Sequence, residues 1–167
     1  MPSEIANNTK ITLGVQRHSI EIRPCAGSHE YPELVAIWRR SVDATHHFLA
    51  ANDRDNIQDQ LATTYFPAVQ IQVADRDGTV VGFSGVLNGK LEMLFVDANQ
   101  QGHGVGTALL KYAVAEQGVL SIDVNEANPA ATKFYQKHNF EVVGRSETDS
   151  AGLPYPLLYL SLRVKNG

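Results

Sequence analysis

The sequence of 167 residues has little of what several classes of protein require. It holds one cysteine, Cys25, which excludes an internal disulfide and is typical of a reducing compartment. Its net charge is −4 and its lysine and arginine residues form no dense cluster, which argues against a nucleic-acid or anionic-membrane surface. It has no apolar run long enough to span a membrane, and its first 18 residues contain no apolar core of a signal peptide. We therefore expect a soluble, cytoplasmic protein with no nucleic-acid or membrane partner.

The composition, with 43% hydrophobic and 19% charged residues, fits one globular domain with a core of its own. No internal repeat or low-complexity tract divides the chain. Residues 1–16 show no sustained period, so we expect a loose N-terminal extension there and a single domain over residues 17–167.

Hydrophobic periods and turn signals predict four helices and seven strands. The helices are expected from Glu30 to Val42, from His46 to Phe66, from Val105 to about Glu116, and from Pro129 onward. The strands are expected at residues 19–23, 69–75, 79–87, 91–97, 119–124, 140–146 and 156–162. Asp-Gly and Asn-Gly pairs separate the second, third and fourth strands, which predicts an antiparallel meander.

Three glycines stand at alternate positions before an apolar helical run in QQGHGVGTALLKYAV, residues 100–114. A helix start with small residues is typical of an anion site, because unpaired amides and the helix dipole both favour negative charge there. A nucleotide P-loop is excluded, since its Gly-Lys-Ser/Thr ending is absent. A dinucleotide fingerprint is excluded too, because its last glycine would fall on Thr107 or Leu109.

The remaining pattern, Gln101 to Gly106, resembles the [QR]-x-x-G-x-[GA] acyl-CoA loop of the GNAT N-acetyltransferase superfamily. The predicted order of strands and helices is also similar to that fold. The resemblance implies an α/β protein with a mixed seven-stranded sheet, about four flanking helices, and acyl-CoA in the splay between the fourth and fifth strands. The chain departs from the family in having Ala98 for proline, Gln101 for arginine and Asn139 for glycine.

Three longer segments are similar to the bacterial YjaB-type N-acetyltransferases: LVAIWRRSVDATHHFL, DVNEANPAATKFYQKHNF and GRSETDSAGLPYPLL. This similarity implies an enzyme that moves the acetyl group of acetyl-CoA to a primary amine, on a protein lysine or a small molecule, in a ternary complex. An acetyl-CoA-binding regulatory domain without turnover is the alternative. The oligomeric state is expected to be a monomer or a homodimer.

The resemblance assigns the cosubstrate to the loop, the preceding strand and the start of the last helix. The implied residues are Leu94, Phe95, Val96, Gln101, Gly102, His103, Gly104, Val105, Gly106, Thr107, Asn128 and Tyr135. Asn128 has a second role open to it as a helix cap. Backbone amides at a bulge in the Leu94–Val96 strand could stabilise the oxyanion.

Acetyl transfer needs a neutral amine, and a lysine-like amine with a pKa of about 10.4 is protonated at neutral pH. Leaving that proton to bulk equilibrium would cost about 4 kcal/mol, whereas positioning the amine can contribute about 7–11 kcal/mol. Glu92 is the expected base, directly or through water, unless it is only a solvated strand carboxylate or pairs with a neighbouring cation. Tyr135 is the expected acid for the departing thiolate, unless it is only a core aromatic residue.

The resemblance implies that the acceptor amine lies near the segment between the first two helices and near the late loop SAGLPYP. Asp43, His46, His47 and Tyr155 are the residues expected to bind it, through charge and aromatic rings. Asp43 and His47 also have the i, i+4 spacing of a helical metal pair, but no further ligand accompanies them, so we expect no metal.

Overall fold

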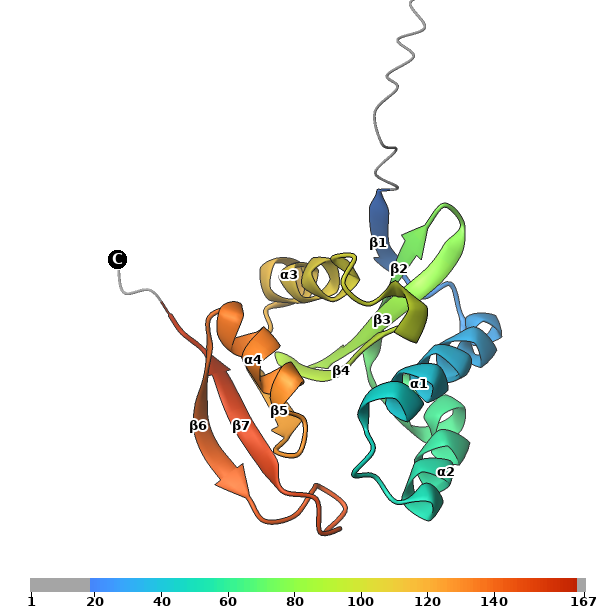
Figure 1. Cartoon of the computed structure of the whole chain (residues 1–167). Helices are drawn as coiled ribbons and strands as arrows, with labels where there is room; N and C mark the ends of the chain where they lie inside the picture. The colour runs from blue at the N-terminus through green and yellow to red at the C-terminus, as the bar shows by residue number, and fades with distance from the viewer. Residues whose placement is uncertain (1–18, 165–167) are drawn as a thin grey trace, which may run out of the picture.

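A computed structural model describes residues 19–164, which form one seven-stranded sheet with helices on both faces (Figure 1). The strands are β1 (Ile20–Pro24), β2 (Gln70–Arg76), β3 (Thr79–Leu87), β4 (Lys90–Val96), β5 (Ser121–Asn125), β6 (Phe140–Ser146) and β7 (Leu157–Leu162). The α-helices are α1 (Tyr31–Thr45), α2 (Ala51–Gln60), α3 (Val105–Gln117) and α4 (Pro129–Lys137). The N-terminal extension predicted for residues 1–16 lies outside the described residues.

The strand order is β1-β2-β3-β4-β5-β7-β6. Every neighbouring pair is antiparallel except β4 and β5, which run parallel. The two predicted hairpins are confirmed, because Asp77-Gly78 and Asn88-Gly89 all have positive φ, as tight β-turns between twisted strands require. The predicted α/β class with a mixed sheet is therefore confirmed.

Three apolar clusters hold the layers together. One joins α1 and the segment after α2 to the middle of the sheet, and Leu34, Ile37 and Phe83 are fully buried in it. A second packs α3 through Val105 and Leu109 on the opposite face. The third joins α3 and α4 to residues of β3, the parallel pair β4–β5, β6 and β7; its buried members are Val86, Leu91, Leu110, Ala113, Val119, Ile122, Val124, Tyr135, Phe140 and Leu160. Within residues 19–164 no helix has both the length and the apolar character needed to cross a membrane.

The helix ends follow the predicted local signals. Asn128 caps α4, since its side chain accepts a hydrogen bond from the Ala131 amide at 3.2 Å. Gly118 and Asn139 end the last two α-helices with left-handed φ values of 66° and 69°. All three predictions are confirmed.

The second helical region differs from the prediction. His46 leaves the helical conformation with φ −103° and ψ 54°, and α2 begins only at Ala51. A π-helical turn at Leu61–Tyr65 and a 3₁₀ turn at Phe66–Ala68 follow α2. The apolar period continued through this break, so it could not locate the loop that His46 opens.

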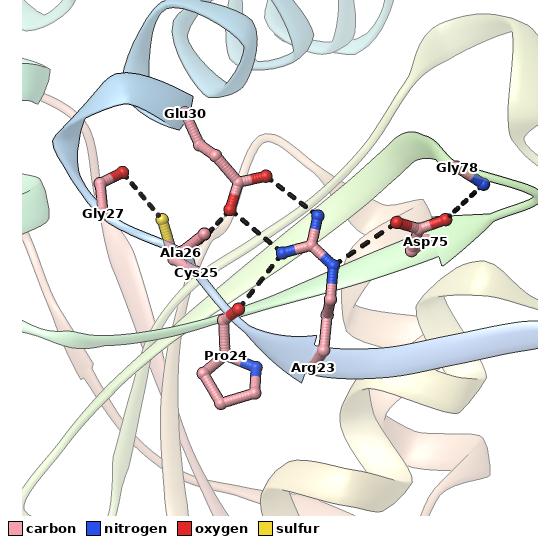
Figure 2. A network of polar contacts seen from close by, with 8 residues as sticks. All are labelled: Arg23, Pro24, Cys25, Ala26, Gly27, Glu30, Asp75 and Gly78. Atoms are coloured by element: carbon pink, nitrogen blue, oxygen red, sulfur yellow. Dashed lines mark hydrogen bonds and ion pairs between the residues drawn. The ribbon is translucent and has the colours of Figure 1, made fainter.

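A polar network fastens β1 to the neighbouring elements (Figure 2). The Arg23 guanidinium donates to both carboxylate oxygens of Glu30, at 3.0 and 2.9 Å, and to Asp75 at 3.3 Å. Asp75 in turn accepts from the Gly78 amide in the β2–β3 turn at 2.7 Å. The Ala26 amide also donates to Glu30. The network lowers the pKa of Glu30 to about 2, chiefly through the hydrogen bonds from Arg23.

Candidate active site

The sheet opens between β4 and β5. Their ladder among the described residues consists of Lys90 opposite Ser121 and Leu91 opposite Ile122. Beyond these two pairs the strands diverge, and backbone groups of both face a gap. Buried backbone amides and carbonyls require partners, so this gap suits a ligand that carries hydrogen-bonding groups of its own.

The bulge in β4 lies at Glu92. On the neighbouring strand Gly85 pairs with Met93 and Val86 pairs with Leu91, which leaves Glu92 as the extra residue. The sequence suggested oxyanion donors at a bulge in the Leu94–Val96 strand, and the structure places the bulge of that strand at Glu92, two residues before Leu94. The bulge also sends Leu91 and Met93 to opposite faces of the sheet, whereas simple alternation would have put them on the same face.

The glycine loop joins the end of β4 to α3. Gly102 and Gly104 have φ values of 81° and 79°, which side chains rarely adopt, and a Cβ added to either would meet nothing within 4 Å. The glycines are therefore needed for the turn itself, and the space beside them is open. Gly104 caps α3, and its carbonyl accepts the first helical hydrogen bond, from Ala108 at 3.0 Å.

An ion pair fixes the start of this loop. Arg40 of α1 donates to both oxygens of Asp97, at 3.0 and 2.8 Å, across 57 positions of sequence. The Asp97 side chain is only 10% exposed, and its backbone amide donates to Val81 at 2.9 Å. A bidentate guanidinium–carboxylate pair is geometrically strict, so the chain leaves β4 in one fixed direction.

The gap and the loop belong to one cavity of about 620 Å³. Most of the residues that the sequence assigned to the site line it. These are His46, Glu92, Leu94, Phe95, Val96, Gln101, Gly102, Gly104, Val105, Gly106, Thr107, Asn128 and Tyr135.

Tyr135 reaches the cavity from α4 and is otherwise buried, with 8% of the residue exposed. Its hydroxyl has no hydrogen-bond partner among residues 19–164, although its ring packs edge-on against Phe134 and Phe140. Burial raises the pKa of this phenol, so it stays protonated and remains a hydrogen-bond donor. A group of this kind can stabilise a thiolate that forms in the cavity.

Two carboxylates line the cavity from opposite sides of the gap, Glu92 on β4 and Asp123 on β5. Lys90 forms a 2.6 Å ion pair with Asp123, while its distance to Glu92 is 4.0 Å. The Glu92 side chain is 35% exposed. Because Lys90 forms its close ion pair with Asp123, the carboxylate oxygens of Glu92 are left available to accept a proton.

His46 forms another wall of the cavity, where its ring lies 5.2 Å from Phe48 and 6.4 Å from Phe95, centre to centre. The Thr45 hydroxyl donates to the Ser41 carbonyl at 2.8 Å and lies 2.7 Å from Nδ1 of His46. A carbonyl oxygen can only accept, so the bond to Ser41 uses the single hydroxyl proton of Thr45. Nδ1 of His46 must therefore carry a proton and donate it to the Thr45 oxygen. The Nε2 atom is then an acceptor, and burial lowers the pKa of the ring, so His46 is neutral near pH 7.

Four assigned residues lie outside the cavity lining. Asp43 is paired with two guanidinium groups, Arg39 and Arg54, each at 3.1 Å. His47 and His103 are exposed. The Tyr155 hydroxyl donates to Asp53 and accepts from the Ala50 amide, which ties the late loop to the start of α2. No group of three potential metal ligands occurs within residues 19–164.

The sequence alone missed several lining residues. They are Ser41, Thr45, Leu91, Met93, Gln100, Ile122, Asp123, Val124, Asn125, Ala130, Ala131 and Phe134. Asp123 carried a usable signal, since it is the only charged residue in the predicted buried strand VLSIDV. The others were assigned to core or not singled out, because their place on the cavity wall depends on how separate elements pack together.

A parallel pair that splays beside a glycine loop and a buried tyrosine defines a class of acyl-CoA-dependent transferases. The acetyltransferase (GNAT) domain family matches residues 67–142. The peptidyl-lysine N-acetyltransferase YjaB of Escherichia coli is 45% identical over 134 residues, which are 79% of this chain and 90% of that protein. The chain belongs to the GNAT family of N-acetyltransferases.

Solved structures agree with this. The solution structure of apo YjaB from Escherichia coli matches with a TM-score of 0.78 and 42% identity, over 86% of this chain and 97% of that one. The PaiA N-acetyltransferase from Thermoplasma acidophilum, solved in complex with coenzyme A, shares the fold with a TM-score of 0.67. That match has 19% identity and covers 87% of this chain and 99% of the other.

Proposed function

We propose that this N-acetyltransferase binds acetyl-CoA in the cavity between β4 and β5 and transfers its acetyl group to the amine of a protein lysine. The observation that carries the proposal is the junction of three features in one cavity: the opened ladder, the glycine loop and Tyr135. The loop would take the diphosphate on its amides and on the start of α3. The backbone of Leu94 and Val96 would pair with the pantetheine arm, with Asn128 on the other side.

Lysine is supported as the acceptor by the similarity to YjaB, whose name describes a peptidyl-lysine N-acetyltransferase. The chemistry of the cavity is compatible with a lysine acceptor. The unprotonated Nε2 of His46 lies on the cavity wall beside the ring of Phe95 and can accept a hydrogen bond. A neutral imidazole can accept a hydrogen bond from a neutral amine without repelling it. Asp43, His47 and Tyr155 would contact the rest of the acceptor outside the cavity.

The reaction needs a proton taken from the amine and a hydrogen bond given to the leaving thiolate. We assign the first role to Glu92, directly or through water, and the second to Tyr135. Glu92 takes one proton from the lysine ammonium, directly or through water, which leaves the neutral amine. As the amine nitrogen then bonds to the thioester carbon, the carbon–sulfur bond breaks. A second nitrogen proton passes to the departing thiolate, which Tyr135 stabilises, and the third stays on the product amide.

The direct test has two parts. One measures acetyl transfer from acetyl-CoA to poly-L-lysine, with thiol release as the readout, and the other measures thermal unfolding in the presence of acetyl-CoA. We expect turnover, and a rise in Tm of roughly 5–10 °C at about 100 times Kd. NAD and ATP are the controls, since both carry phosphates but lack pantetheine. A rise with acetyl-CoA but no turnover would indicate a binding domain without catalysis, and equal rises with all three ligands would contradict the proposal.

A further inference from the structure

The cavity proposed for a strongly anionic ligand is poor in positive charge. Its lining among the described residues includes Glu92 and Asp123 but no lysine or arginine. The loop itself, residues 100–107, has no lysine or arginine either. Because the diphosphate must leave water to bind, backbone amides alone would have to compensate several negative charges.

Among residues 19–164, Arg76 is a cation that contacts this loop. It ends β2, and its Nη1 donates to Oε1 of Gln100 at 2.6 Å. Its Nη2 reaches the carbonyl of His103 at 3.5 Å. The same guanidinium therefore holds both ends of the Gln100–His103 turn, and Gln100 is part of the cavity wall.

The contact with the His103 carbonyl has a consequence for the loop amides. In a planar trans peptide the carbonyl and the next amide point in opposite directions. A His103 carbonyl held toward Arg76 turns the Gly104 amide away from Arg76, and Gly104 lines the cavity. Arg76 thus fixes the direction of a donor at the start of α3.

The third nitrogen of the Arg76 guanidinium, Nε, is fully buried and makes no hydrogen bond within the described residues. A guanidinium kept partly unsatisfied in such a place is costly unless its charge is used. The loop that it touches is where a diphosphate would bring compensating negative charge.

We propose that Arg76 is a positioning residue for the diphosphate of acetyl-CoA, which orients the glycine loop from behind and supplies the charge that Gln101 lacks. The proposal rests on the proposed function, because it concerns the same cosubstrate. It assigns to β2 a task that the loop sequence does not perform by itself.

The test compares two acetyl donors, acetyl-CoA and S-acetylpantetheine, which has no phosphate. Their dissociation constants are measured for the full-length wild type and for Arg76→Gln, by calorimetry for the first ligand and ligand-observed NMR for the second. We expect Arg76→Gln to weaken acetyl-CoA about tenfold, the size of one charge-assisted contact, and to leave S-acetylpantetheine within twofold. The weakening is expected to shrink in high salt, which screens charge.

Arg163→Gln is the matched control, because it removes the same charge from a side chain that is 66% exposed at the end of β7. It should leave both affinities unchanged. Arg76→Lys keeps the positive charge but lacks the planar guanidinium, and we expect its acetyl-CoA affinity to lie within about threefold of the wild type. This variant also replaces Arg76→Gln in the comparison if Arg76→Gln does not fold. Equal losses for both donors, or no loss for acetyl-CoA, would overturn the proposal. A wild type that binds neither donor would refute the proposed function instead.

Discussion

The Glu30 carboxylate offers a sharp test of how β1 is fastened to the domain (Figure 2). Its pKa lies at about 2 instead of 4.5, because Arg23 donates two hydrogen bonds to it. At about 1.4 kcal/mol per pH unit, this difference corresponds to roughly 3 kcal/mol of stability at pH 7. Since 14% of the side chain is exposed, water screens part of it, and we expect Glu30→Gln to cost about 2 kcal/mol.

The pH dependence follows from the sign of the shift. The folded protein holds Glu30 ionised, so its contribution is complete above pH 4.5, where the carboxyl of the unfolded chain is ionised too. As the pH falls from 4.5 toward 2, the unfolded chain binds a proton that the folded protein does not. The stability that Glu30 provides is therefore lost across this window, and most of it is gone by pH 3.

Thermal unfolding followed by circular dichroism measures this. At pH 7 we expect Glu30→Gln to lower Tm by roughly 4–8 °C, and the difference to narrow as the pH falls to 3. Glu141→Gln is the control, since its carboxylate also pairs with an arginine, Arg163 at 3.2 Å, but is 49% exposed. The Tm of Glu141→Gln at pH 7 should fall by at most half as much as that of Glu30→Gln. A Glu30→Gln protein that matches the wild type at pH 7, or whose deficit is the same at pH 3, would refute the reasoning.

Three further predictions concern the cavity. Tyr135→Phe should lower kcat about 100-fold and leave acetyl-CoA affinity unchanged, which stopped-flow kinetics and calorimetry can separate; a full-rate variant would remove Tyr135 from the mechanism. Glu92→Gln should lower kcat mainly at low pH, and an unchanged pH–rate profile would exclude Glu92 as the base. The lowered pKa of His46 means that the unfolded chain binds its proton first as the pH falls below 6.5. Wild-type Tm should therefore fall between pH 7 and 5 more than that of His46→Phe, and parallel curves would contradict the assignment.

Local signals made much of the fold predictable from the sequence. A turn such as Asn88-Gly89 and a cap such as Asn128 act within a few residues, so the residue types indicate the conformation directly. The bulge at Glu92 could not be predicted in this way, because it depends on how β4 pairs with β3. The insertion of β7 between β5 and β6 is likewise set by long-range packing, for which the local pattern holds no information.

The candidate site divides along the same line. The glycine loop is a contiguous motif, and its residues from Gln101 to Thr107 line the cavity except His103. Asp123 and Arg76 come from separate strands; the sequence marks Asp123 only as the single charge of its strand, and no motif marks Arg76. The Arg40–Asp97 pair spans 57 positions, so the constraint it places on the loop is visible only in three dimensions.

The splay between β4 and β5 is an opening in an otherwise continuous sheet, and neighbouring contacts stabilise it. Opening a ladder exposes backbone groups whose hydrogen bonds would otherwise be made, and this is unfavourable in a buried place. The free-energy cost of the opening is limited here for two reasons. The remaining pairs at Lys90 and Leu91 hold the strands together, and α3 and α4 pack against the strands that flank the opening. In the proposed complex, the pantetheine arm of acetyl-CoA would pair with the open edge as an added strand does, because it carries amides along an extended chain. The strand geometry that makes the sheet locally incomplete therefore also sets the shape and polarity of the site that we propose for the cosubstrate.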